Sequence, residues 1–267
     1  MIAALMGTLA FAGQGQASAP SQVPRWSLDV EPARCVLQGQ EPGSRFTLSI
    51  DTIPGSDSYR LAVAGADIKP AASLVPASLT FAPSGAELKG FARTTNTPEG
   101  TPIILMAGVA PSLLDDLTNA ESITITAGSE IRSTVPIFHA AKAVEALRRC
   151  NADQLIEWGA DPTQFAPGGK GPIALKDRDY WVPDSILRAA AGQSKRSLIS
   201  DDFRVTVATD GTDSNCQAVA GVTEAGMEKS ICSAVMTKRL FTPARDANNG
   251  AVRGIATFRV MLFIRPR

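Results

Sequence analysis

The chain has 267 residues, 44% of them hydrophobic, and a mean hydropathy close to zero. This length allows two ordinary domains that each bury a core, and this composition argues against long disordered segments. The 26 basic and 26 acidic residues cancel, and no basic stripe interleaved with aromatic residues appears. Nucleic acid is therefore not the expected partner.

The charge is divided unevenly along the chain. Residues 20–169 contain 11 basic and 16 acidic residues, whereas residues 170–267 contain 15 basic and 10 acidic residues. This division predicts either docking of two domains or a basic C-terminal face aimed at an acidic partner. A scattered, solvated surface is the equally simple alternative.

The first twelve residues are largely apolar, and Ala17-Ser18-Ala19 matches a small-residue cleavage signature. A run of about 12 residues is too short for an uncleaved membrane span, which needs about 20. No Lys or Arg precedes the run, which leaves the true start codon open. We expect residues 1–19 to be a signal peptide and the mature chain to be exported.

Residues 20–164 are expected to form a β-rich N-terminal domain. Short alternating stretches between Pro-, Gly- and Ser-rich turns predict an antiparallel sheet or sandwich. The strands are expected at residues 26–30, 46–50, 59–63, 87–94, 103–109 and 122–126. Helices are expected at 112–118 and 139–158, the longer one directing Ala143, Leu147 and Leu155 toward the core.

The segment 165–176 marks the domain boundary. It reads FAPGGKGPIALK, with two prolines and three glycines. This composition disfavours regular structure, so we expect a short flexible linker.

Residues 177–267 predict a helix packed on a short antiparallel sheet. Apolar residues alternate with polar ones from Phe203 to Val207, and Asp210-Gly211 follows as a tight turn. The apolar period becomes helical from Met227 onward. Pro243 cannot extend that helix, so an exit turn is expected before a last strand that ends at Phe263. The whole chain is thus expected to be an α+β protein.

Four cysteines, Cys35, Cys150, Cys216 and Cys232, are too widely spaced for a zinc site. Three disulfide pairings are possible, and segregation by domain favours Cys35–Cys150 and Cys216–Cys232. Four buried free thiols, normal in a reducing cytosol, are the alternative.

The C-terminal part resembles the C-terminal domain of TonB-type energy transducers of Gram-negative bacteria. The resemblance covers about residues 178–267. It rests on the segment from Val205 to Gly211, the two cysteines Cys216 and Cys232, the Phe241-Thr242-Pro243-Ala244 motif and the strand to Phe263. Tyr180-Trp181-Val182-Pro183 and Ile186-Leu187-Arg188 resemble the lead-in helix of the same family. The membrane anchor and long proline-rich spacer of that family are not found here. The resemblance therefore implies the fold and a habit of binding protein segments, rather than energy transduction.

The N-terminal part is similar to periplasmic proteins of the invasion-associated locus B type. The similarity lies in the opening Trp26…Cys35 and in the stretch from Ala146 to Cys150 before Trp158-Gly159. Together the two resemblances imply a periplasmic location.

The sequence offers no catalytic motif. His139 is the single histidine, and neither an orienting acid nor a nucleophile can be assigned to it. Signatures of serine hydrolases, zinc proteases and phosphate-binding loops are absent. The acids around Asp210 and Asp213 depart from a calcium loop, and Asp201-Asp202 are expected in a turn before a strand. We expect no enzyme activity, cofactor or metal.

The leading hypothesis is a non-enzymatic interaction module of the cell envelope. A small sheet exposes an edge to which an extended segment of an envelope or outer-membrane protein can add by main-chain hydrogen bonds. The candidate edge is the last strand, with the residues Arg253, Thr257, Arg259, Met261 and Phe263. An ordinary strand covered by the N-terminal domain is the alternative.

Two other functions are retained. One is a hydrolase acting on envelope material, with His139 near Asp153 or Glu157 across the domain cleft. The other is an architectural protein that self-associates, as a homodimer, through its C-terminal domain.

Overall fold

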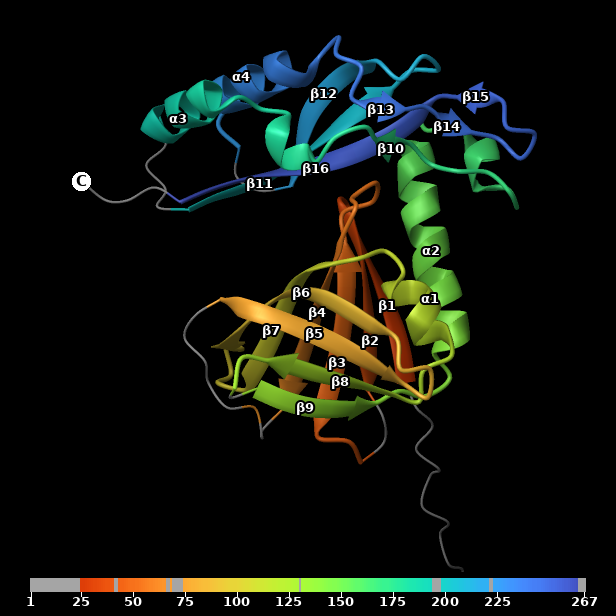
Figure 1. Ribbon diagram of the computed structural model, residues 1–267, viewed down its shortest axis with the longest axis vertical. Coiled ribbons are helices and arrows are strands. Elements are labelled where there is room, and N and C mark those ends of the chain that lie inside the picture. The colour runs from red at the N-terminus through yellow and green to blue at the C-terminus, as the bar shows by residue number, and fades with distance from the viewer. Residues whose placement is uncertain are drawn as a thin grey trace, which may run out of the picture.

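The computed structural model describes residues 25–40, 43–65, 68, 74–129, 131–193, 198–220 and 223–263. The predicted signal peptide, 1–19, lies outside these residues. The protein is mixed α and β, built mostly from antiparallel sheets with few helices (Figure 1). Two hydrophobic cores form, one from residues between Cys35 and Cys150 and one from residues between Trp181 and Val260.

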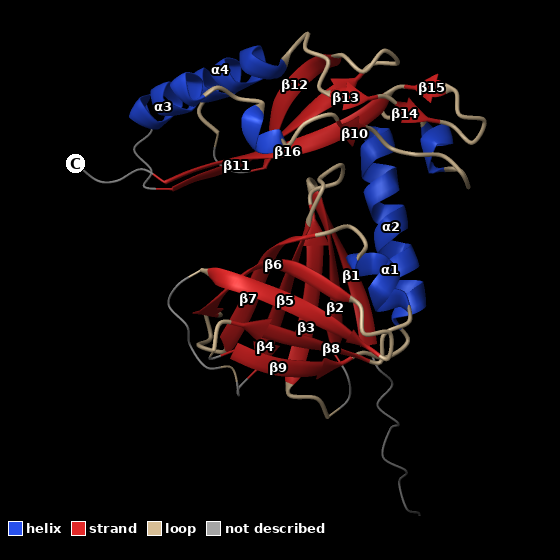
Figure 2. Ribbon diagram, viewed as in Figure 1, coloured by secondary structure: helices blue, strands red, loops and turns tan. Residues whose placement is uncertain are grey.

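Nine strands of the N-terminal region form one antiparallel sheet in the order β1-β2-β3-β4-β7-β6-β5-β8-β9. The strands are β1 (Arg25–Glu31), β2 (Arg34–Gln40), β3 (Phe46–Thr52), β4 (Tyr59–Gly65), β5 (Val75–Ala82), β6 (Glu87–Asn96), β7 (Pro102–Val109), β8 (Ser122–Ala127) and β9 (Ile131–Pro136). The sheet curls around its core (Figure 2).

All six strands expected in this region are present, and three more were missed. In β2 the residues Cys35, Val36 and Leu37 are consecutively buried, so this strand lacks the alternation used to recognise the others. β5 and β9 were also overlooked, although both pair in register with β8.

Helix α1 (Leu113–Thr118) and the long helix α2 (Ala140–Glu157) match the two predicted helices closely. α2 packs on β1 and β2 and extends toward the C-terminal region (Figure 1). Ala143 and Leu147 face the core as expected, but Leu155 is only half-buried. Gln154 is buried instead, because its amide donates to the Glu31 carbonyl at 2.6 Å.

The segment 165–176 is mostly turn and coil, but it also holds short pieces of regular structure that its composition did not predict. After the short 3₁₀ helix η1 (Pro162–Phe165), Lys170 forms a bridge with Arg245, and β10 (Ile173–Ala174) pairs with β13 (Phe241–Thr242). Composition alone missed this order because the hydrogen-bonding partners come from residues about 70 positions further along the chain.

The C-terminal region has a three-stranded antiparallel sheet in the order β12-β11-β16, with α3 and α4 on one face (Figure 1). Its elements are η2 (Arg178–Tyr180), α3 (Asp184–Gln193), β11 (Leu198–Val207), β12 (Asp213–Ala220), α4 (Ala225–Val235), β14 (Ala244–Arg245), β15 (Ala251–Val252) and β16 (Gly254–Phe263). An aromatic cluster holds this core, with ring centroids 4.8 Å apart for Trp181–Phe241, 5.6 Å for Trp181–Phe258 and 5.4 Å for Phe203–Phe258.

Candidate functional site

The candidate site is the outer edge of β16. β11 is the central strand of the sheet and pairs with β16 in an unbroken register from Leu198–Phe263 to Val207–Gly254. β16 therefore has β11 on one side and an edge on the other. Edge strands present main-chain N–H and C=O groups that another extended segment can use.

Alternation along β16 assigns its side chains to two faces. Phe258 and Val260 are buried against the core beneath α3 and α4. Arg259 and Met261 occupy the opposite face, and the Met261 side chain is 52% exposed. An exposed methionine on a sheet face is typical of adaptable contact surfaces.

The N-terminal region covers the first half of this edge. The Thr257 N–H donates to the Gly55 carbonyl at 3.0 Å, and the Arg253 carbonyl accepts from the Asp161 N–H at 2.9 Å. Gly55 belongs to residues 53–58, the β3–β4 loop. The covered-strand alternative thus holds for one half of β16.

The second half of the edge is open among the described residues. In an antiparallel ladder, alternate residues direct their main-chain groups to the same side. Thr257 points outward, since it bonds Gly55, so Arg259 and Met261 point outward as well. We find no main-chain partner for their outward groups in the described part of the chain.

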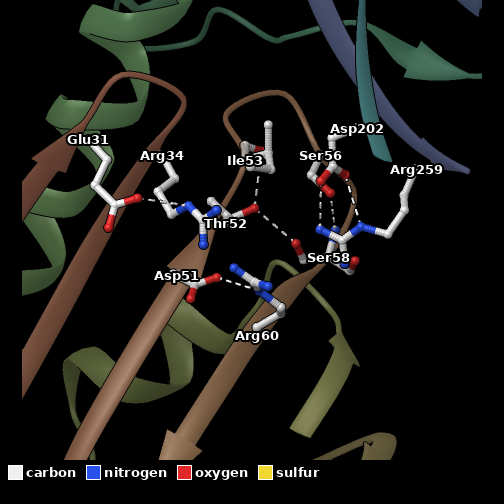
Figure 3. Close-up of polar contacts among 10 residues, drawn as sticks. All are labelled: Glu31, Arg34, Asp51, Thr52, Ile53, Ser56, Ser58, Arg60, Asp202 and Arg259. Carbon is white, nitrogen blue, oxygen red and sulfur yellow. Dashed lines mark hydrogen bonds and ion pairs between the residues drawn. The ribbon is translucent and has the colours of Figure 1, made fainter. Parts of the chain in front are cut away.

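The side chain of Arg259 is fixed on the face of the sheet that also carries Met261. Its guanidinium donates to both carboxylate oxygens of Asp202, at 2.9 and 3.1 Å (Figure 3). The two residues are also register partners on adjacent strands. A bidentate ion pair of this kind holds both side chains in a defined orientation beside the open edge.

Arg178 closes the junction between the covered edge and the β3–β4 loop. It donates to the Gly55 carbonyl at 3.2 Å and to the Thr257 carbonyl, and it forms an ion pair with Asp57 at 2.9 Å. The guanidinium also lies 5.7 Å from the Trp181 ring. Burial lowers the pKa of Arg178, and Asp57 opposes that shift.

Contacts between the two regions involve part of the excess positive charge of the C-terminal half. Arg178, Arg204 and Arg253 belong to the basic C-terminal half, and all three contact the N-terminal region. The Arg204 guanidinium lies 4.9 Å from the Trp158 ring centroid, and Arg253 donates to the Gly159 carbonyl at 2.7 Å. Electrostatic attraction to Glu157 opposes the lowering of the Arg204 pKa by burial.

The five predicted edge residues therefore lie in different surroundings. Thr257 is buried under the β3–β4 loop, which corrects the expectation that it is accessible to a partner. Arg253 is exposed but already hydrogen-bonded, Arg259 is ion-paired, and Met261 is exposed. The backbone of Phe263 pairs with Leu198 at the end of β16.

Sequence reasoning missed Gly55, Arg178 and Asp202. The dipeptide Pro54-Gly55 indicates a turn but no contact with β16, and no local sequence pattern indicates a role for Arg178. Asp201 and Asp202 were expected in a turn, but both are buried within β11. The burial of Asp202 is possible because it pairs with Arg259 across the sheet, a partner 57 residues away.

Both cysteine pairs form, in the arrangement favoured by domain segregation. Cys35 and Cys150 join β2 to α2, and Cys216 and Cys232 join β12 to α4. Within the described residues, no helix has both the length and the apolar character needed to cross a membrane.

The hydrolase arrangement proposed for His139 is not supported by the geometry. His139 caps the N-terminus of α2 with a left-handed φ of 50°, whereas Asp153 and Glu157 lie near the other end of the same helix. At about 1.5 Å per residue, Asp153 is about 21 Å away along the axis. No cluster of three or more His, Cys, Asp or Glu residues that could hold a metal occurs in the described chain.

In the C-terminal region, the acid with a strongly raised pKa is Asp213. Its side chain is buried, and neither carboxylate oxygen has a hydrogen-bond partner. Burial raises its pKa to about 7. The neighbouring Asp210 behaves in the opposite way, since hydrogen bonds from Thr212 lower its pKa.

Comparison of the chain with protein-family models, with curated proteins and with solved structures gives no match. The site is therefore interpreted from its own geometry.

Proposed function

We propose that this protein is an exported, non-enzymatic interaction module of the Gram-negative cell envelope, located in the periplasm. It binds an extended segment of an envelope or outer-membrane protein, which adds as a fourth strand to the C-terminal sheet beside β16. Main-chain hydrogen bonds supply the affinity in this mode, and alternate side chains supply the specificity.

One observation carries the proposal. The outward main-chain groups of Arg259 and Met261 lie on the edge of a three-stranded sheet, without partners in the described chain. The exposed Met261 side chain and the Asp202–Arg259 pair flank this edge. An incoming segment would thus meet two main-chain positions, one apolar side chain and one fixed charge pair.

The proposal is tested with Met261→Pro in the full chain, and with Met261→Ala as the matched control. Proline removes the outward N–H of residue 261, which the β11–β16 ladder does not use, so the sheet is expected to survive. Alanine removes the same side chain and keeps the N–H. An array of short peptides from envelope proteins serves as the probe.

We expect binding by the native protein and by Met261→Ala, and its loss in Met261→Pro. Binding that survives equally in both variants contradicts strand addition, as does a folded native protein that binds no peptide. Light scattering on the same samples tests the architectural alternative, because homodimers joined through β16 would be weakened by the same proline.

A further inference from the structure

The β3–β4 loop behaves as an occupant of the β16 edge. Its neck is closed by Thr52, whose hydroxyl donates to the Ser58 carbonyl at 2.9 Å (Figure 3). Ile53 and Pro54 are buried, and Gly55 makes the one main-chain bond to Thr257. The loop thus makes the contact that the first residue of an added strand would make.

Glycine is strongly favoured at the point of contact. Gly55 has a φ of +82°, and an ideal Cβ there would lie 3.2 Å from Ala256 Cα, from the Ile255 carbonyl oxygen and from the Thr257 nitrogen. These are main-chain atoms of a paired strand, so they cannot move aside cheaply. A segment that follows the same backbone path over β16 is therefore expected to place a glycine at this point as well.

An acid is required two residues later. The Arg178 side chain is 11% exposed, and Asp57 is the carboxylate paired with it. A buried guanidinium without a counter-charge is costly. Arg178 also donates to the Thr257 carbonyl, which an added strand would otherwise bond through an N–H. A segment in the position of the loop must therefore satisfy Arg178.

We infer that the β3–β4 loop mimics the ligand of this site. The partner segment contacts Thr257 through a glycine that takes positive φ, followed two positions later by aspartate or glutamate. The rest of the segment runs extended beside Arg259 and Met261, and the segment competes with residues 53–58 for β16. This inference rests on the proposed function and narrows it to one class of segment. Displacing the loop would lengthen the open edge from Arg259 back to Thr257.

The probe is a synthetic peptide with the sequence of residues 51–60, DTIPGSDSYR. The protein is the full chain with Gly55→Val, which is expected to displace the native loop from β16 because valine adds a Cβ at a crowded position of positive φ. Gly85→Val is the matched control, because Gly85 also has positive φ, at +71°, but no atom lies within 4 Å of its ideal Cβ. A second variant replaces residues 54–57 with an Asn-Gly turn too short to reach β16.

We expect both loop variants to bind the peptide about tenfold or more tightly than the native protein and Gly85→Val, because the competing segment is gone. The same peptide with valine at the glycine should not bind. With asparagine in place of its second aspartate, it should bind about threefold more weakly, as expected for a partly exposed ion pair.

Hydrogen exchange at the Thr257 amide reports whether the loop has left β16. If this amide exchanges freely and the loop peptide binds neither variant, the inference that the β3–β4 loop mimics the ligand is refuted. In this case, the proposed function still holds if other peptides of the array bind the protein and if Met261→Pro abolishes their binding. If no peptide of any kind binds the opened edge, the proposed function fails as well.

Discussion

The N-terminal and C-terminal regions stabilise their cores in different ways. The N-terminal core is largely aliphatic and is enclosed by one curled sheet, and its buried polar residues are uncharged. The C-terminal core relies on an aromatic cluster, and all buried aspartates of the described chain, Asp201, Asp202 and Asp213, belong to this region. Buried acids are costly unless they are paired.

This difference indicates that the two regions have different structural roles. The N-terminal region follows the ordinary rules of core formation and serves as a scaffold that places the β3–β4 loop. The C-terminal region departs from those rules beside the β16 edge, with a largely buried arginine side chain and a partly buried ion pair. Departures of this kind tend to collect at functional sites.

The largest expected effect comes from the two disulfides. Cys35–Cys150 spans 115 residues and Cys216–Cys232 spans 16. In the chain-entropy model, alanine at both positions of the first pair lowers the free energy of unfolding by about 4.7 kcal/mol, and of the second by about 3 kcal/mol. Urea titrations measure both.

Tryptophan fluorescence separates the regions in these titrations. Trp26 and Trp158 report on the N-terminal region, and Trp181 reports on the C-terminal core. Losing the first pair should shift mainly the transition of the N-terminal region. Equal losses from the two pairs would contradict a dependence on loop length.

The second effect concerns Asp213. Its folded-state pKa of about 7 lies above the unfolded value of about 3.9. The native state therefore holds a proton that the unfolded state has released, and stability falls as the pH rises from about 4 to about 7. Asp213→Asn should abolish this fall and stabilise the protein by about 2 kcal/mol at about pH 8, with little change at about pH 4.

Asp210→Asn is the control on the same turn. Hydrogen bonds from Thr212 lower the Asp210 pKa, so this carboxylate contributes stability above its unfolded pKa, and that contribution is lost as the pH falls through the folded value. Asp210→Asn should therefore destabilise the protein at neutral pH. Urea titrations at both pH values measure the two variants, and the same sign for both at about pH 8 would contradict the assignment.

The smallest effect compares one ion pair from each region. Asp202–Arg259 has two hydrogen bonds and a largely buried acid, whereas Asp51–Arg60 has one bond at 2.6 Å in the N-terminal region. We expect Asp202→Asn to cost about 1 kcal/mol and Asp51→Asn about 0.5 kcal/mol. Thermal unfolding of both variants tests this order, and an equal or reversed cost would remove the special role given to the C-terminal pair.

Much of the fold could be predicted from local patterns. Alternation located six N-terminal strands and parts of β11 and β16, the apolar period located α2 and α4, and Pro111 marked the start of α1. The missed strands are informative. β2 carries a continuous apolar run, and the two-residue strands β10 and β13 are too short to show a period.

The candidate site was predictable in part. The last strand was expected to be an edge, and β16 occupies that position. Which half of the edge is open could not be predicted, because the covering groups belong to Gly55 and Asp161, far away in the sequence. The same holds for Asp202, whose burial depends on Arg259.

The sequence by itself determined the α+β composition, the two helices of the N-terminal region, the alternating faces of β16 and the cysteines available for pairing. These features depend on periodicity and spacing, which are local properties. The tertiary structure alone decided that Gly55 contacts β16, that the Arg178 side chain is largely buried at the junction and that Arg259 and Met261 lack outward main-chain partners among the described residues. These features depend on groups brought together from distant parts of the chain, and no local pattern encodes such contacts.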